Sequence, residues 1–461
     1  MHDQSIAKNY EAMTSDRDAF LHRARACAEL TIPTLMPPEG HTGSSQFNTP
    51  YQSVGARGVN NLASKLLVTL LPPNTPFFRL TIDDFDLAEL GGDARGKAEE
   101  ALARIERSAT QIVESKAIRV PTFEALKQLI NSGNALVYMP PKQGMKVFRL
   151  DRYVVQRDTM GSMLTIIVKE TIAFDVLPKE IKEALLENPE YQADTNKKEC
   201  DLYTCVRRVG SKFEVHQEVH GIVIPDSKGS YKEESLPWLP LRFIAIDGED
   251  YGRGFVEEYA GDLKSLESLT RAIVEGSAAS AKLLFMVRPN GTTKIRNIAD
   301  APNGAIISGD AADVTTLQAN KFNDFRVAQE TMNTITERMS YAFLLNSSVQ
   351  RNAERVTAEE VRFMAQELET ALGGIYSVLS QEFQLPLVTG LEALGRGQDL
   401  NKLSSFIQML QPLGQEVIQS ELNIGDYLSR LGASLGIDTQ GLVKSDEQKQ
   451  QEQEAQQAAM Q

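Results

Sequence analysis

Two long helical patterns that follow one another along the chain constrain its fold most strongly. The first covers residues 255–288 and spaces its apolar side chains almost as a heptad repeat, which corresponds to ~50 Å of helix. The second occupies about residues 323–343 and also has one apolar face. Between them lie strand-like stretches at 305–307 and 314–317. We therefore predict a pair of long helices that flank a small, strand-bearing tip.

Such a pair of helices has too little core of its own if it stands alone. The first helix also carries a run of small residues at 276–281, which permits another helix to approach closely. Packing side by side with copies of the same chain would bury the remaining apolar surface of each pair. The pattern therefore predicts an oligomer.

A sharply specified helix start follows the second long helix. Thr357 and Glu360 have the spacing of a capping box, in which each side chain accepts a hydrogen bond from the backbone amide of the other residue. An amphipathic pattern of roughly seven turns then continues to Phe383. Gly373 and Gly374 lie in its middle, and because each costs roughly 1 kcal/mol relative to alanine we expect a kink there.

The polar loop before this helix carries Arg351 and Arg355. One interpretation is that both are solvated, or that Arg355 pairs with Glu359 in the adjoining turn. The other is that a loop between two long helices presents Arg351 to a phosphate. The layout favours a loop directed at something anionic.

The rest of the chain is predicted to combine helices with one block of strands. Helices are expected at four places, residues 5–30, 54–71, 94–115 and 121–132. A strand is expected at 78–82, and the block from Ala135 to Ile246 reads as mostly β, with a short helix near 178–186. The predicted fold class is α+β, mainly helical.

Bulk properties exclude several classes of protein. A net charge of −14 argues against a broad basic face that grips nucleic acid, although it permits a surface along which DNA slides. Three cysteines are too few for a disulfide framework. The most apolar stretch, residues 62–71, is too short to span a membrane, and the N-terminus has no apolar signal core, so we expect a soluble protein.

Motifs for catalysis are weak. Residues 91–98 match a P-loop except that Ala98 stands where Ser or Thr must bind magnesium, and residues 247–255 lack the third glycine of a dinucleotide fingerprint. His216 and His220 lie with Glu214 and Glu218 on what we predict to be one polar strand face, solvated or at an interface. We expect no active site, no cofactor and no metal.

Six stretches spread over nearly the whole chain resemble the portal, or head-to-tail connector, protein of short-tailed bacteriophages of the podovirus, autographivirus type. They are YQSVGARGVNNLASKLLVTLLPP (51–73), FEALKQLINSGNALVYMP (123–140), DRYVVQRD (151–158), DGEDYGRGFVEEYAGDLKSLESL (247–269), YAFLLNSSVQRNAERVTAEEVRFMAQELETALGGIYSVLSQEFQLPLV (341–388) and GLEALGRGQDL (390–400). One departure is that the motif ending at Val388 is followed almost directly by the motif starting at Gly390, whereas relatives carry a further wing segment between these two motifs.

The resemblance implies a ring of twelve subunits at one capsid vertex with a central channel for double-stranded DNA. It also implies a division of the chain into eight parts: an α+β wing (1–254), a stem helix (255–288), a small α/β clip (289–322), a second stem helix (323–343), a tunnel loop (344–356), a kinked wing helix (357–397), a helical crown (398–445) and a polar, Gln-rich tail (446–461).

Candidate site residues follow from this division. The tunnel-loop candidates for contact with DNA are Asn346, Ser347, Ser348, Val349, Gln350, Arg351, Asn352 and Arg355. Asp324, Glu330 and Glu337 are candidates for an acidic channel wall that repels phosphate and keeps the duplex mobile. Lys294, Arg296 and Asp310 are candidates for the contact between the clip and a tail adaptor.

The expected partners are further copies of the chain, double-stranded DNA, the terminase motor, a tail adaptor, and the major capsid and scaffolding proteins. Internal core proteins are an additional option, and no membrane is expected. The expected location is the virion, with the host cytoplasm during assembly. Two alternatives stay open: a nucleotide-dependent DNA translocase that uses residues 91–97, and a cytoplasmic scaffold whose paired helices bind a partner.

Overall fold

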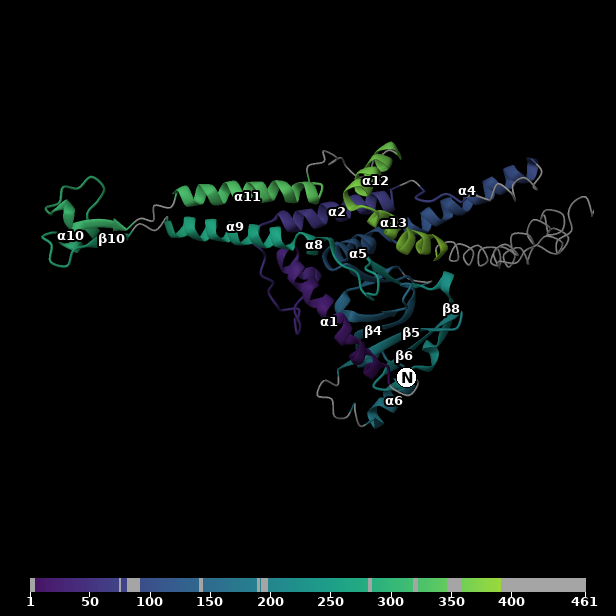
Figure 1. The fold of residues 1–461 in the computed structure, drawn as a ribbon. Helices are drawn as coiled ribbons and strands as arrows, with labels where there is room; N and C mark the ends of the chain where they lie inside the picture. Colours follow the sequence, from purple (N-terminus) through teal and green to yellow (C-terminus); the bar gives the residue numbers. More distant parts are fainter. Residues whose placement is uncertain are drawn as a thin grey trace, which may run out of the picture.

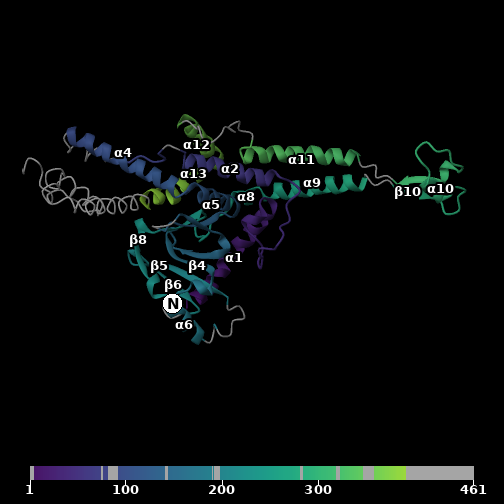
Figure 2. The same cartoon turned by 180° about the vertical axis from the view of Figure 1, so that it is seen from behind.

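The computed structural model describes residues 5–73, 76–80, 92–140, 144–188, 191, 198–280, 284–317, 322–345 and 358–390. A β-rich body lies beneath a layer of helices, and a two-helix arm projects from this layer and ends in a small tip (Figure 1). The view from behind shows the same separation of arm and body (Figure 2). The arrangement predicted from the two long helical patterns is therefore confirmed.

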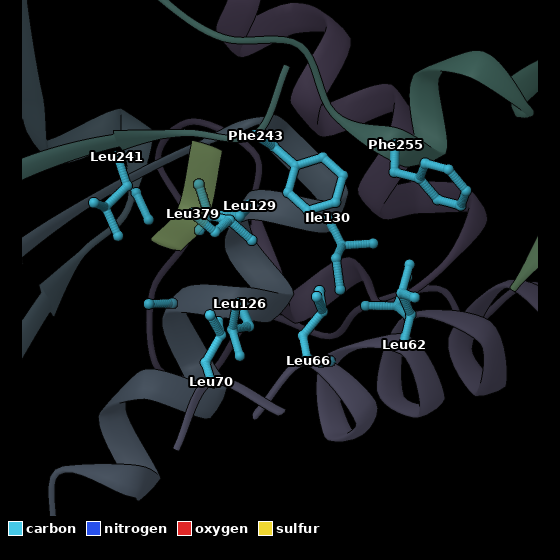
Figure 3. Packing of buried hydrophobic residues seen from close by; sticks show 14 of the residues in the cluster. Leu62, Leu66, Leu70, Leu126, Leu129, Ile130, Leu241, Phe243, Phe255 and Leu379 are labelled. Carbon is cyan, nitrogen blue, oxygen red and sulfur yellow. The ribbon is translucent and has the colours of Figure 1, made fainter. Parts of the chain in front are cut away.

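In the described residues before the strands there are four helices, close to the predicted positions. They are α1 (Ile6–Leu30), α2 (Val54–Leu70), α4 (Gly92–Ser115) and α5 (Arg119–Ser132). The main core lies between α2 and α5, where leucines of the two helices face each other with Phe243 and Phe255 beside them (Figure 3). The strand predicted at 78–82 is wrong for its described part, because residues 78–80 form no strand.

The block from Ala135 to Ile246 is mostly β, as predicted, and its described part forms two antiparallel sheets. The smaller has the order β2-β1-β9, from β1 (Asn134–Tyr138), β2 (Lys146–Phe148) and β9 (Trp238–Arg242). The larger has the order β3-β4-β5-β6-β7 with β8 also on β6, from β3 (Tyr153–Arg157), β4 (Met163–Ala173), β5 (Glu199–Val209), β6 (Lys212–Val219), β7 (Ile222–Val223) and β8 (Gly229–Lys232). The predicted short helix is α6 (Lys179–Glu187).

Short 3₁₀ turns lie between the helices and strands of the described chain. They are η1 (Pro33–Leu35), η2 (Leu150–Arg152), η3 (Phe174–Val176), η4 (Pro225–Ser227), η5 (Glu233–Ser235) and η6 (Ala311–Asp313).

Glu218 of β6 corrects the prediction that this polar strand face is solvated or at an interface. Its carboxylate is buried and accepts hydrogen bonds from the backbone N–H of Ile6 at 3.0 and 3.2 Å. The start of α1 has unpaired N–H groups and a partial positive charge, both of which a carboxylate satisfies. Glu218 therefore fixes the first turn of α1 on the sheet, which local alternation could not indicate.

The glycines of the 247–254 segment serve close backbone packing. A Cβ on Gly254 would lie 2.4 Å from the carbonyl oxygen of Asn131, and one on Gly252 would lie 2.6 Å from the carbonyl oxygen of Gly133. Ile244 and Arg253 pair across this segment as an isolated antiparallel bridge. The segment is a turn that leads from a strand region into a helix, as predicted.

The first long helix is shorter than predicted. The structure has a short helix α8 (Phe255–Glu258), then α9 (Ala260–Ser280), and residues Leu284–Val287 form strand β10. The expectation of continuous helix to residue 288 is therefore wrong. β10 pairs antiparallel with β11 (Val314–Leu317), a strand that was predicted, whereas residues 305–307 form no strand. A four-residue apolar run fits a helix or a strand equally well, and the distant partner decides.

The second long helix is α11 (Phe322–Ala342), and α10 (Ile295–Ala299) lies in the tip. Helix α11 is followed by α12 (Ala358–Leu372), α13 (Ile375–Leu379) and a π-helical turn η8 (Ser380–Gln384). A kink was predicted at Gly373 and Gly374, and the helix is interrupted there: the two glycines separate α12 from α13 with φ of 55° and 86°. Thr357, the crown segment 398–445 and the tail 446–461 lie outside the described residues.

Candidate functional site: the two-helix arm and its tip

The arm consists of α9 and α11, which run antiparallel and side by side (Figures 1 and 2). Their contact buries Leu263 and Leu266 of α9 against Ile335 and Met339 of α11. Arg338 of α11 pairs with Asp262 of α9 at 2.8 Å. These contacts fix the register of the two helices near the base of the arm.

Gly276 permits the close approach predicted for the run of small residues. A Cβ at this position would lie 2.7 Å from the ring of Phe325 on α11. Farther towards the base, the hydroxyl of Thr270 lies 3.4 Å from the sulfur of Met332. The helices therefore stay in contact along most of the described arm.

The base of the arm is an aromatic cluster that contacts α2. The ring of Phe343 lies 5.6 Å from that of Phe255 and 5.9 Å from that of Tyr259. The side-chain amide of Asn61 donates to the carbonyl oxygens of Phe343 and Leu344 at 2.9 and 3.0 Å. The last carbonyls of a helix lack partners within the helix, so α2 supplies the missing donor.

Helix α2 also contacts α12. The ammonium of Lys65 lies 3.1 Å from the carboxylate of Glu367, and the side chains are only 8% and 24% exposed. Asn61 and Lys65 are four residues apart, so they share one side of α2. One helix therefore holds both described elements that flank residues 346–357.

Sequence reasoning did not identify this role of α2. The available signal was an asparagine and a lysine four residues apart inside a helix with a well-defined buried apolar face. A polar residue on a buried helix requires a partner, because an unpaired one is costly.

The tunnel-loop candidates cannot be placed. Asn346, Ser347, Ser348, Val349, Gln350, Arg351, Asn352 and Arg355 all lie outside the described residues. The described chain ends before them at Leu345, shortly after Leu344 adopts the left-handed region with φ of 54°.

The three channel-wall candidates do not share one line on α11. Glu330 and Glu337 are seven residues apart, on the side of the helix that faces away from α9, and both are exposed. Asp324 is also exposed but lies about 120° around the helix from Glu330. The structure therefore groups Glu330 with Glu337 and separates Asp324 from them.

The edge of the arm that carries Glu330 and Glu337 faces away from the β-rich body. Glu267 of α9 fixes the arm to the segment that precedes α2, because its carboxylate accepts from the backbone N–H of Tyr51 and of Gln52 at 3.1 Å each. In Figure 1 α9 lies on the side of the body and α11 on the far side.

The tip is organised around Asp313. Its carboxylate accepts from the backbone N–H of Thr293 at 3.2 Å and from the hydroxyl of Thr292 at 3.3 Å. Burial raises the pKa of Asp313, but these hydrogen bonds outweigh it and hold the pKa below its ordinary value. A Cβ on Gly291 would lie 2.4 Å from the carboxyl carbon of Asp313, so only glycine fits there.

The adaptor candidates differ in their surroundings. Lys294 is exposed, and Arg296 is exposed with Asp300 3.8 Å away. The carboxylate of Asp310 accepts from the backbone N–H of Ala312 at 2.9 Å and so caps η6. Lys294 and Arg296 are therefore available to a partner, while Asp310 also shapes the tip.

The P-loop resemblance does not produce a phosphate-binding loop. Residues 92–98 form the first two turns of α4, so residues 92–97 do not form the glycine-rich loop that a P-loop requires. Within the described ranges there is no group of three or more His, Cys, Asp or Glu side chains arranged to hold a metal ion. No helix in those ranges is long and apolar enough to cross a bilayer.

Comparison with known proteins gives consistent matches. The family model "Bacteriophage head to tail connecting protein" matches residues 3–391. The portal protein of Escherichia phage T7 is 41% identical over 96% of this chain and 88% of its own length, and that of Enterobacteria phage T3 is 42% identical with the same coverage. The portal protein of Enterobacteria phage SP6 is 32% identical over 99% of this chain and 93% of its own.

Proposed function

Because this chain belongs to the family of bacteriophage head to tail connecting proteins, we propose that it is a portal subunit that closes into a twelve-membered ring at one capsid vertex. The ring would conduct double-stranded DNA during packaging and ejection, and it would dock the terminase motor and then the tail adaptor. The observation that supports this most directly is the arm, which stands away from the body with one free acidic edge.

The division into wing, stem, clip, tunnel loop and crown is part of the proposal, with one amendment. The clip would begin at β10 and not at residue 289, because β10 pairs with β11 inside the tip. Residues 255–280 and 322–342 would then form the stem. Lys294 and Arg296 remain the residues that we propose for the contact with the adaptor.

Glu330 and Glu337 are proposed to line the channel. They lie on the edge of the arm opposite the body, and a body that extends outward from the ring leaves that edge facing the axis. Repeated in every subunit, these carboxylates would repel the phosphates of the DNA and so prevent tight binding. A wall of Lys or Arg would instead hold the DNA, because each phosphate that it neutralised would add salt-dependent affinity.

Arg351 is proposed to act as a local brake on DNA where the tunnel loop narrows the channel. The support is its position in a polar segment between α11 and α12, both of which α2 holds in place. An Arg351→Ala particle is expected to lose packaged DNA more readily, whereas Arg351→Lys keeps the charge and is expected to retain it.

The experiment that tests the channel wall uses particles assembled with Glu330→Lys and Glu337→Lys. Packaging is expected to slow, and DNA ejection is expected to become more sensitive to salt concentration. Glu187→Lys on α6, an exposed position of the body, is the matched control and is expected to package normally. Normal packaging by both arm variants would remove the proposed wall.

The translocase alternative needs a phosphate-binding loop at residues 91–97, and residues 92–97 are helical. The proposed location is the virion at the portal vertex, reached after assembly with the major capsid and scaffolding proteins in the host cytoplasm. Native mass spectrometry of the purified chain distinguishes a closed ring from a scaffold protein that binds a different partner.

A further inference from the structure

The two helices of the arm form a layer with two faces, which we call its flanks. Three consecutive residues of α11 place opposite charges on these two flanks. The middle one, Phe325, packs on Gly276 of α9. Asp324 precedes it and Arg326 follows it, and each lies about 100° around the helix from Phe325. Both are exposed, and neither forms an ion pair with any described residue.

Three consecutive residues of α9, Ala272, Ile273 and Val274, place side chains of different size on the two flanks. Ile273 lies seven residues after the buried Leu266 and so shares the side that faces α11. Ala272 and Val274 lie on either side of it, and Val274 is 49% exposed. One flank therefore has a small side chain and the other a protruding branched one.

The antiparallel run of the two helices determines which residues share a flank. Val274 and Arg326 each follow the residue that faces the partner helix, so they project from the same flank. Ala272 and Asp324 each precede it, so they project from the other. Asp262 and Arg338, which are paired at 2.8 Å, both precede a contact residue and agree with this assignment.

A closed ring relates neighbours by rotation alone, without a shift along the axis. If the arm is parallel to the axis, each residue therefore meets the neighbouring copy at its own height. Asp324 and Arg326 differ in height by only about 3 Å, and the same holds for Ala272 and Val274.

From these relations, and on the basis of the proposed ring, we propose that the arms of neighbouring copies pack flank to flank. Arg326 of one copy pairs with Asp324 of the next, and Val274 packs against Ala272 of the next copy. This assigns Asp324 to the contact between subunits, whereas the sequence suggested the channel wall. Glu330 and Glu337 keep the wall because they lie on the free edge between the flanks.

The remaining α11 positions along the flanks are compatible with this contact. The Arg326 flank continues with Asn333 and Ser340, and the Asp324 flank continues with Thr331 and Arg338, each at seven-residue intervals. At matching heights, the amide of Asn333 thus meets the hydroxyl of Thr331 of the next copy, and the hydroxyl of Ser340 meets the guanidinium of Arg338 of the next copy. No like charges meet among these α11 positions.

Charge reversal in the full-length chain tests the contact. Asp324→Arg alone and Arg326→Asp alone each place like charges at every interface, and the protein concentration for half-maximal ring formation is expected to rise about fivefold or more. The double variant with both changes restores opposite charges and is expected to assemble as the original chain does. Sedimentation velocity and native mass spectrometry measure the ring fraction.

The double variant also separates assembly from folding. Asp324 lies in the first turn of α11, where an acidic residue stabilises the helix, so Asp324→Arg alone weakens the helix start. The double variant retains Arg at 324, and its recovery therefore cannot come from the helix start. Lys264→Asp, an exposed reversal on the α9 edge that faces away from α11, is the matched control and is expected to leave assembly unchanged.

The outcomes distinguish this inference from the proposed function. If the original chain forms rings and both single reversals assemble equally well, or the double variant fails to recover, the flank contact is wrong and the portal function stands. If the original chain forms no ring under capsid-assembly conditions, the proposed function itself is wrong, and the flank contact with it.

Discussion

The ring of Phe343 lies directly against the backbone of Gly58, so that a Cβ on Gly58 would lie 2.5 Å from the ring carbon Cγ. This contact joins α2 to the end of α11 and therefore joins the helical layer to the base of the arm. It lies between residues that are far apart in the sequence, and it leaves no room for any side chain at position 58.

Gly58→Ala is expected to destabilise the protein although alanine favours helix formation. The clash with the Phe343 ring costs about 1–3 kcal/mol, which outweighs a helix-propensity gain of about 1 kcal/mol. Thermal unfolding followed by circular dichroism measures the change. Gly261→Ala, on α9 with open space around it, is the control and is expected to be neutral or stabilising. A Gly58→Ala variant at least as stable as the original would contradict the contact.

Glu367→Gln is expected to lower the free energy of unfolding by about 1–3 kcal/mol, because the mostly buried ion pair between Lys65 and Glu367 loses one of its two charges. Urea unfolding measures this. The double variant Lys65→Met/Glu367→Leu is expected to recover part of the loss, since it replaces the mostly buried ion pair with an apolar contact. Glu369→Gln on the exposed side of α12 is expected to cost less, and equal losses for Glu367→Gln and Glu369→Gln would argue against the pair.

Cys27 is expected to resist alkylation in the folded protein. Burial, and next the nearby Glu257 carboxylate, raise the pKa of its thiol to about 12, so almost none is thiolate at pH 8. Iodoacetamide followed by peptide mass spectrometry measures labelling with and without urea. Cys200 and Cys205 are also buried and are expected to follow the same course. Rapid labelling of Cys27 in the absence of urea would show that α1 is not docked as described.

The tip is expected to loosen in acid. The depressed pKa of Asp313 means that its contribution is complete above the ordinary aspartate pKa, about 3.9, and is lost as the pH falls through the lower folded value. Amide exchange of peptides from 284–317 measures this, and peptides from β5 serve as the internal reference. Asp313→Asn is expected to exchange faster near neutral pH and to converge with the original chain in acid. Identical exchange at pH 7 would show that the carboxylate does not organise the tip.

Local patterns were sufficient to predict much of the architecture. Periodicity indicated the helices of the arm, alternation indicated the β block, and Gly373 with Gly374 indicated the break before α13, where positive φ angles are found. The resemblance to portal proteins was likewise carried by motifs in the chain itself, and the family match over residues 3–391 confirms it. Each of these signals lies within a few turns of sequence, so no distant partner is needed to read it.

The tertiary structure alone decided the features that depend on such partners. The apolar run Leu284–Val287 is a strand because β11 pairs with it, and Glu218 is buried because the start of α1 lies on it. The tertiary structure also decides that Glu330 and Glu337 lie on the free side of α11 and that Asp324 does not, because the position of α9 determines which side of α11 is free. A residue's type sets which contacts it can make, but only the packing of distant segments determines which contact it makes.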